Sequence, residues 1–156
     1  MRTPSVYVDT SVFGGVFDEE FEASSKSFFD LVRDGRFSLL ISDVTRQEIG
    51  FAPAHVQSHF EQLLAFVELI AVDERVLALR DAYLAAQIVS PQWADDATHV
   101  AAATVAGADL IVSWNFRHIV HFDKVRLYNA VSVFQGYRPV DIRSPLEVID
   151  YEDQDV

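Results

Sequence analysis

The sequence contains no cysteine and few basic residues, 12 Lys and Arg against 24 Asp and Glu. The lack of cysteine excludes disulfide bonds, thiol nucleophiles and cysteine-ligated zinc sites. No apolar run approaches the ~20 residues that cross a bilayer. We expect no secretory signal, because the stretch before the first acid, MRTPSVYV, is too short for the usual apolar core. These absences fit a cytoplasmic protein without a membrane span.

The charge balance gives a formal net charge of −12. Such a protein repels nucleic acid at long range, which argues against non-specific binding through a basic surface. It remains compatible with a nuclease whose acidic site is neutralised by divalent ions. Part of the acidity lies in residues 147–156, which hold five acids and no base. We interpret these residues as a solvated, partly disordered tail that follows a single domain of residues 1–146.

Short apolar segments alternate with segments of helical spacing along the chain. We expect strands at residues 5–9, 37–42, 67–72 and 109–113, and helices at 20–34, from 43, from 53, 74–89 and 94–106. A helical turn should begin within 115–122, and 124–134 is ambiguous, with a short strand and a turn as one reading. The alternation predicts an α/β fold, a three-layer α/β/α sandwich around a mainly parallel sheet.

Acids and an amide stand where functional residues gather in such sheets, beyond the carboxyl ends of the strands. Asp9 ends the first strand, and Glu48 lies in the helix after the second strand. Asp96 lies in the first turn of the Ala-rich helix, and Asn115 follows the 109–113 strand. Crowded carboxylates repel each other, and bound Mg²⁺ or Mn²⁺, which prefer oxygen ligands, would relieve that repulsion.

Each candidate also has a simpler structural explanation. Asp9 could cap the next helix, and Glu48 could form a capping box with Thr45. Asn115 could cap the turn that follows it, and Asp96 could complement the helix dipole. None of these explanations accounts for the convergence of the acids at one edge of the sheet.

Helix geometry separates Asp96 from its neighbour Asp95. At about 100° per residue, the small and apolar residues of this helix share one face, which should pack on the sheet. Asp96 borders that face and Asp95 points away from it. We therefore take Asp96 as the candidate ligand and expect Asp95 to be solvated.

Four segments of the chain, taken in order, resemble a known family. They are VDTSVFGG at 8–15, TRQEI at 45–49, ADDATHVAAA at 94–103 and IVSWN at 111–115. The set resembles PIN-domain nucleases, and especially the toxins of VapC-type toxin–antitoxin pairs. The resemblance implies an endoribonuclease that hydrolyses RNA phosphodiesters with Mg²⁺ or Mn²⁺ held by Asp9, Glu48 and Asp96. It also implies a cognate antitoxin and a homodimer.

The chain departs from the family at the end of the last motif. The family often has a further acid after the Ser or Thr of that strand, where this sequence has Asn115, and the next candidate is His118. An amide brings no charge, so we expect one tightly bound metal rather than two. Arg117 with His118 is the candidate phosphate contact, and Ser113 belongs to the same strand end. Thr10 could bind a metal water or phosphate, or cap a helix.

Two other functions fit parts of the sequence. A catalytically weak or inactive PIN-like protein-binding module is favoured by Asn115 and the net charge, but not by the three retained acids. An acidic-site phosphatase or receiver domain would need a second acid beside Asp9 and a suitably placed lysine, which Lys124 is not. We interpret His99 as a packed or surface residue and Trp114 as packed, although Trp114 could stack on a base.

Overall fold

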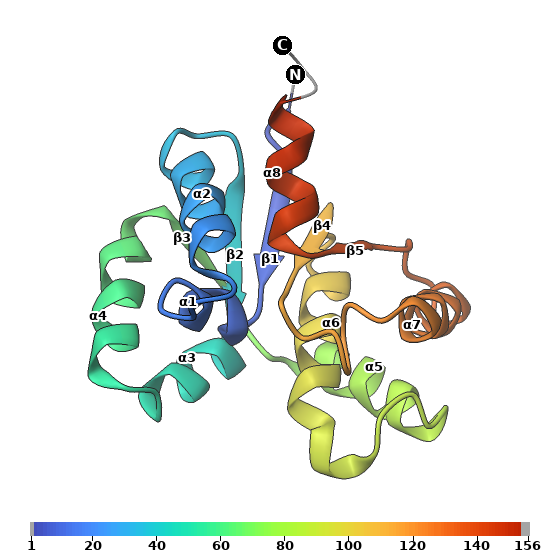
Figure 1. Ribbon diagram of the computed structural model, residues 1–156. Coiled ribbons are helices and arrows are strands. Elements are labelled where there is room, and N and C mark those ends of the chain that lie inside the picture. Colours follow the sequence, from blue (N-terminus) through green and yellow to red (C-terminus); the bar gives the residue numbers. More distant parts are fainter. Residues whose placement is uncertain (1, 154–156) are drawn as a thin grey trace.

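Within residues 2–153, which the computed structural model describes, five parallel strands form one sheet (Figure 1). The strand order is β3-β2-β1-β4-β5, with β1 at the centre. All four pairings are parallel, so the carboxyl ends of all the strands lie at one edge. The strands are β1 (Ser5–Val8), β2 (Ser38–Ser42), β3 (Val67–Ile70), β4 (Leu110–Val112) and β5 (Asp141–Arg143).

Helices cover both faces of the sheet, as Figure 1 shows. One layer consists of α1 (Thr10–Gly15), α2 (Glu22–Arg33), α4 (Ala54–Leu63) and α8 (Pro145–Asp153). The opposite layer consists of α5 (Glu74–Ala85), α6 (Ala94–Val105) and α7 (Phe122–Phe134). The remaining helices are α3 (Asp43–Gly50), which contacts α4 and α6, and the 3₁₀ turns η1 (Leu64–Phe66) and η2 (Pro91–Trp93). None of the described helices is long and apolar enough to cross a membrane.

The two faces of β1 belong to two separate cores. Val6 and Val8 pack with α1 and α2, whereas Tyr7 packs with α5 and α6. All three side chains are fully buried, because a central parallel strand is covered on both faces and reads as a continuous apolar run. The predicted three-layer α/β/α fold is confirmed, and the sheet is parallel throughout the described residues.

The short strand considered for residues 124–134 is wrong, because α7 (Phe122–Phe134) covers this segment. Only Tyr128 and Ser132, one helical turn apart, are buried. Phe122 and Phe134 are largely exposed although they are apolar. Exposed apolar residues outside the buried stripe therefore obscured the helical period in the sequence.

The expected start of the tail, between residues 146 and 147, falls inside α8 (Pro145–Asp153). Val148 is buried among the same core residues as Phe28 and Phe29 of α2, and Ile149 packs against them. The start of α8 therefore packs on the domain through Val148 and Ile149, while Glu147 stays exposed. The last three residues expected in the tail, 154–156, lie outside the described residues.

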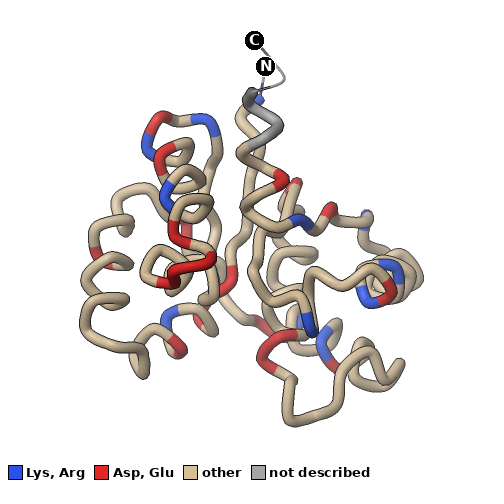
Figure 2. Tube along the Cα trace, viewed as in Figure 1, with Lys and Arg blue, Asp and Glu red and all other residues tan. Residues whose placement is uncertain are grey.

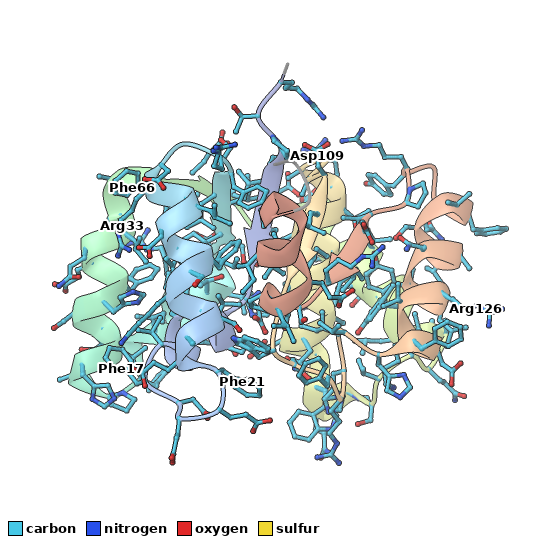
Figure 3. All side chains as sticks on the ribbon, turned by 45° about the horizontal axis from the view of Figure 1, so that its top comes forward. Phe17, Phe21, Arg33, Phe66, Asp109 and Arg126 are labelled. Atoms are coloured by element: carbon cyan, nitrogen blue, oxygen red, sulfur yellow. The ribbon has the colours of Figure 1, made fainter. Side chains whose placement is uncertain are left out.

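Asp109 lies at the amino-terminal edge of the sheet, where its carboxylate is stabilised by hydrogen-bond donors. Its carboxylate accepts hydrogen bonds from the Ser5 backbone NH at 2.8 Å and from Arg2 Nη2 at 2.6 Å. Figure 3 labels Asp109 where β1 and β4 begin, at the opposite end of the molecule from Phe17 and Phe21. The backbone hydrogen bond from Ser5 and the nearby Arg2 lower the pKa of Asp109. This edge therefore carries a stabilised charge.

Trp114 joins α1 and α2 to the end of β4. Its indole Nε1 donates to Ser25 Oγ at 2.8 Å, and its ring stacks on Phe21 with centroids 4.1 Å apart. The packed interpretation of Trp114 is confirmed. A Cβ added at Gly15 would lie 2.5 Å from Ser25 Oγ and 2.7 Å from Trp114 Nε1, so the contact needs glycine.

We predict that Gly15→Ala lowers the free energy of unfolding by about 1–3 kcal/mol, because the added methyl overpacks the Trp114–Ser25 contact. Gly14→Ala is the matched control, since a Cβ there meets no atom within 4 Å. This control should be neutral or raise stability by up to about 1 kcal/mol. Chemical denaturation measures both variants, and equal effects would contradict the packing account.

Candidate functional site

Asp9 directly follows β1 and is 4% exposed. It occupies the N-cap position of α1, but its side chain makes no capping hydrogen bond. Instead it accepts a hydrogen bond from Ser11 Oγ at 2.6 Å, and Ser11 Oγ accepts one from the Trp114 NH at 2.9 Å. Among the described residues no Lys or Arg pairs with Asp9. The capping explanation therefore does not account for this buried carboxylate.

Glu48 lies in the last turn of α3, and the capping box predicted for it is wrong. The box is formed by Ser42 and Thr45 at the start of the helix. Glu48 Oε1 accepts a hydrogen bond from Thr10 Oγ1 at 2.8 Å and lies 2.6 Å from His99 Nε2. Thr10 thus binds Glu48 rather than capping a helix.

Asp96 lies in the first turn of α6 and is half-buried, whereas Asp95 is exposed, as the helix geometry predicted. Burial raises the pKa of Asp96 overall, although the nearby Asn115 amide lowers it. The Asn115 Oδ1 atom accepts the His118 NH at 2.9 Å, so it caps the following turn, and the amide NH₂ is the donor that remains near Asp96. Ser113 Oγ accepts the Asn115 NH at 2.9 Å and fixes this turn at the end of β4.

A cleft of about 370 Å³ opens at this edge of the sheet. It is lined by Glu48, Gln92, Trp93, Asp95, Asp96, Asn115, Arg117 and His118. Asp9 is buried and does not line it. Figure 2 shows acidic segments at the end of β1 and the start of α6 on the same side of the sheet, the side opposite the chain termini.

Three side chains form one wall of the cleft. The rings of Trp93 and His118 stack with centroids 4.6 Å apart, and the Arg117 guanidinium carbon lies 5.6 Å from the Trp93 ring centroid. Sequence reasoning selected Arg117 and His118 but not Trp93. The only signal for Trp93 was its position immediately before the helix that carries Asp96.

Burial and repulsion between carboxylates raise the pKa values of two of the acids, Asp9 and Asp96. Burial raises the pKa of Asp9, and the nearby Asp96 carboxylate adds to the increase. Burial also raises the pKa of Asp96, with a further contribution from Glu48. The three carboxylates therefore affect one another, as expected if they share one site.

Of the two interpretations of His99, the packed one is confirmed, and His99 is also hydrogen-bonded to Glu48. Burial alone would lower its pKa, yet Tyr7, Glu48 and Asp9 around the ring raise the pKa of His99 well above the ordinary value. Burial raises the pKa of Glu48, but the hydrogen bond and charge of His99 outweigh it and lower the pKa overall. This pair was missed because the contact joins residues 51 positions apart.

His118 differs from His99, since both of its ring nitrogens are buried without a hydrogen-bond partner among the described residues. Burial lowers the pKa of His118, and the neighbouring Lys124 and Arg117 contribute in the same direction against Asp96. The neutral imidazole stacks on Trp93 at the side of the cleft.

The donor set suits Mg²⁺ or Mn²⁺, which take carboxylate and water oxygens. No three acidic or histidine side chains form a ready-made metal-binding group in the part of the chain that is described. Mg²⁺ does not require such a group, because one or two carboxylates usually hold it while it keeps several waters. Both Glu48 and Asp96 line the cleft, and Glu48 Oε2 accepts no hydrogen bond from the described residues.

A sequence profile of the PIN domain matches residues 5–117. The chain belongs to the PIN-domain family. The match includes Asp9, Glu48, Asp96 and Asn115, and it ends at Arg117. No curated protein sequence matches the chain.

Two solved structures share the fold of this chain. VapBC2 from Rickettsia felis, solved bound to a DNA fragment from its promoter, aligns with a TM-score of 0.57 and 11% identity over 90% of this chain and 98% of the other. FitAcB from Neisseria gonorrhoeae aligns with a TM-score of 0.54 and 11% identity over the same fractions. At this identity the similarity establishes the fold.

We predict that Asp96→Asn raises the free energy of unfolding at pH 7 by about 0.5–2 kcal/mol in metal-free buffer. Because the pKa of Asp96 is raised, the folded protein favours its protonated form. The protonated form adds its full contribution to the free energy of unfolding below the ordinary pKa near 3.9, and this contribution is lost as the pH rises through the folded-state pKa. The gain should therefore disappear below about pH 4. Asp95→Asn, on the same helical turn but exposed, is the control and should not stabilise the fold. Thermal denaturation against pH tests this, and a loss of stability in Asp96→Asn would contradict it.

Proposed function

We propose that this PIN domain is a metal-dependent endoribonuclease and the toxin of a VapC-type toxin–antitoxin pair. The observation that carries the proposal is the placement of Asp9, Glu48 and Asp96, from three separate segments, at one edge of a PIN-type sheet. The raised pKa values of Asp9 and Asp96 support it, since a bound cation would stabilise both carboxylates. Residues 1–146 would form the catalytic domain together with the rest of α8, whose Val148 packs in the same core.

In this proposal Asp9, Glu48 and Asp96 hold one Mg²⁺ or Mn²⁺. A divalent cation held by these residues would lower the pKa of a bound water and neutralise charge on the phosphate. Ser11 holds Asp9, and Thr10 and His99 hold Glu48. Asn115 orients Asp96 through its amide NH₂, because its oxygen is engaged by the His118 NH.

Arg117 is the proposed phosphate contact. Ser113 and His118, from the same end of β4, are the further candidates for substrate binding. The Arg117 guanidinium is exposed over Trp93 and forms no ion pair with any described residue. A guanidinium in this position suits bidentate binding of a phosphate. It also supplies a positive charge at the cleft of a protein whose net charge of −12 repels RNA.

The antitoxin partner rests on the family motifs and on the two structural relatives. The fold similarity to VapBC2, whose structure holds a DNA fragment from its promoter, and to FitAcB supports a cognate antitoxin for this chain. A homodimer and a cytoplasmic location belong to the same proposal. A small upstream gene that encodes a basic DNA-binding protein would support the pairing.

We predict that Asp9→Asn and Asp96→Asn each reduce Mg²⁺- or Mn²⁺-dependent RNA cleavage by at least ~100-fold, since a metal ion contributes several kcal/mol to catalysis. Asp30→Asn, which changes an exposed acid of α2 outside the cleft, is the control and should stay close to the parent protein. Cleavage of a mixed RNA pool, with and without EDTA, measures the effect.

Two outcomes contradict the proposed function. Cleavage that survives both substitutions would place the chemistry elsewhere. A protein that cleaves no RNA with either metal would favour the protein-binding module instead.

A further inference from the structure

A chain of hydrogen bonds runs through the core between α3, β1 and α6. Ser42 Oγ lies 2.7 Å from Tyr7 Oη, and Tyr7 Oη lies 2.7 Å from His99 Nδ1. His99 Nε2 lies 2.6 Å from Glu48 Oε1. Ser42, Tyr7 and His99 are at most 1% exposed, and only Glu48 reaches the cleft.

The direction of the last hydrogen bond is fixed by chemistry. A carboxylate can only accept hydrogen bonds, so His99 Nε2 carries a hydrogen and donates a hydrogen bond to Glu48. Tyr7 Oη bridges His99 Nδ1 and Ser42 Oγ, and Ser42 Oγ also accepts the Val44 NH. Every polar atom in this buried chain has a partner, which is the condition for tolerating it in a core.

Each segment that carries one of the three candidate acids also contributes a residue to this series of hydrogen bonds. Tyr7 lies two residues before Asp9 on β1, and His99 lies one helical turn after Asp96 on α6. Glu48 is on α3, whose N-cap is Ser42. His99 is therefore linked to the segments of all three carboxylates.

The Glu48 side chain is held on one oxygen only. His99 and Thr10 both donate to Oε1, and among the described residues nothing donates to Oε2. The Glu48 side chain is 34% exposed, so without these donors it would sample several rotamers in the cleft. The two donors leave the second oxygen oriented and available to a cation.

We propose that His99 is a positioning residue that, through the Ser42–Tyr7–His99 chain, fixes the Glu48 carboxylate for metal binding. The proposal rests on the metal-dependent function above. Groups that hydrogen-bond a metal ligand commonly change metal affinity about 10- to 100-fold when removed. The contribution of His99 thus belongs to metal binding and is separable from its contribution to packing.

The decisive measurement is the Mn²⁺ dissociation constant by calorimetry, with thermal stability and the kcat and KM of RNA cleavage beside it. His99→Leu removes the donor, and we expect Mn²⁺ binding to weaken about 10- to 100-fold. His99→Gln places an amide NH₂ near the Nε2 position and should recover most of that loss. Tyr7→Phe keeps the imidazole but loses its partner, and should weaken binding less than His99→Leu.

Tyr83→Phe is the matched control for Tyr7→Phe. Tyr83 is also fully buried, and its hydroxyl lies 2.6 Å from Ser132 Oγ, between α5 and α7 and outside the cleft. Both substitutions delete a buried tyrosine hydroxyl that contacts a serine. Only Tyr7→Phe should change the Mn²⁺ dissociation constant.

The outcomes separate the two proposals. If the parent protein binds Mn²⁺ and cleaves RNA but His99→Leu and Tyr7→Phe bind Mn²⁺ as it does, the positioning role is wrong and the nuclease stands. If the parent protein neither binds Mn²⁺ nor cleaves RNA, both proposals fail. Should His99→Leu not fold, Tyr7→Phe against Tyr83→Phe decides the question alone.

Discussion

The placement of three like charges at one edge of a sheet is the constraint around which this molecule is built. Parallel strands bring Asp9 and the helices carrying Glu48 and Asp96 to the same edge. Burial and mutual repulsion oppose the charges of Asp9 and Asp96 there. His99 is the histidine that contacts Glu48 and affects both other acids, so its hydrogen bond to Glu48 links the fold to the site.

The two edges of the sheet show what this arrangement means for stability. At the amino-terminal edge, Asp109 is paired with Arg2 and the Ser5 backbone, and its pKa is lowered. At the carboxyl edge, Asp9 has hydroxyl donors but no described Lys or Arg partner, and its pKa is raised. At the amino-terminal edge the ionised carboxylate is stabilised by its partners. At the carboxyl edge the ionised carboxylate of Asp9 lacks a described partner of this charge and would be stabilised by a bound cation. Unfavourable charges of this kind are common at functional sites.

Much of the fold could be predicted from local patterns. Four of the five described strands and most helices were visible, because the two faces of the sheet bury continuous apolar runs, and helix geometry distinguished Asp96 from Asp95. The edge strand β5 (Asp141–Arg143) was not predicted, because it is short and only its central residue is buried. Residues 124–134 were ambiguous because only Tyr128 and Ser132 of α7 are buried while apolar neighbours are exposed. The carboxy-terminal helix was hidden by its acids, although Val148 packs in the core.

The sequence predicted that the candidate acids converge, but not the contacts that hold them. Asp9 follows from the end of a strand, and Glu48 and Asp96 follow from helices whose position relative to the sheet is set by the α/β alternation. The role of Thr10 and the hydrogen bond of His99 depend on contacts across the fold, which no spacing reveals. The cap that Asn115 makes on the His118 NH is local, and the sequence offered it as an explanation for this residue. The capping box was assigned to Thr45 and Glu48 because the Ser42 start of α3 lies one turn earlier.

The central claim is that these three acids share one divalent cation. Anomalous diffraction at the manganese edge, from crystals soaked in Mn²⁺, tests it most directly. The account predicts a single strong peak coordinated by carboxylate oxygens of Asp9, Glu48 and Asp96. A crystal with Mn²⁺ bound only at other acids, or with no ion at this edge while the cleft is open to solvent, would contradict it.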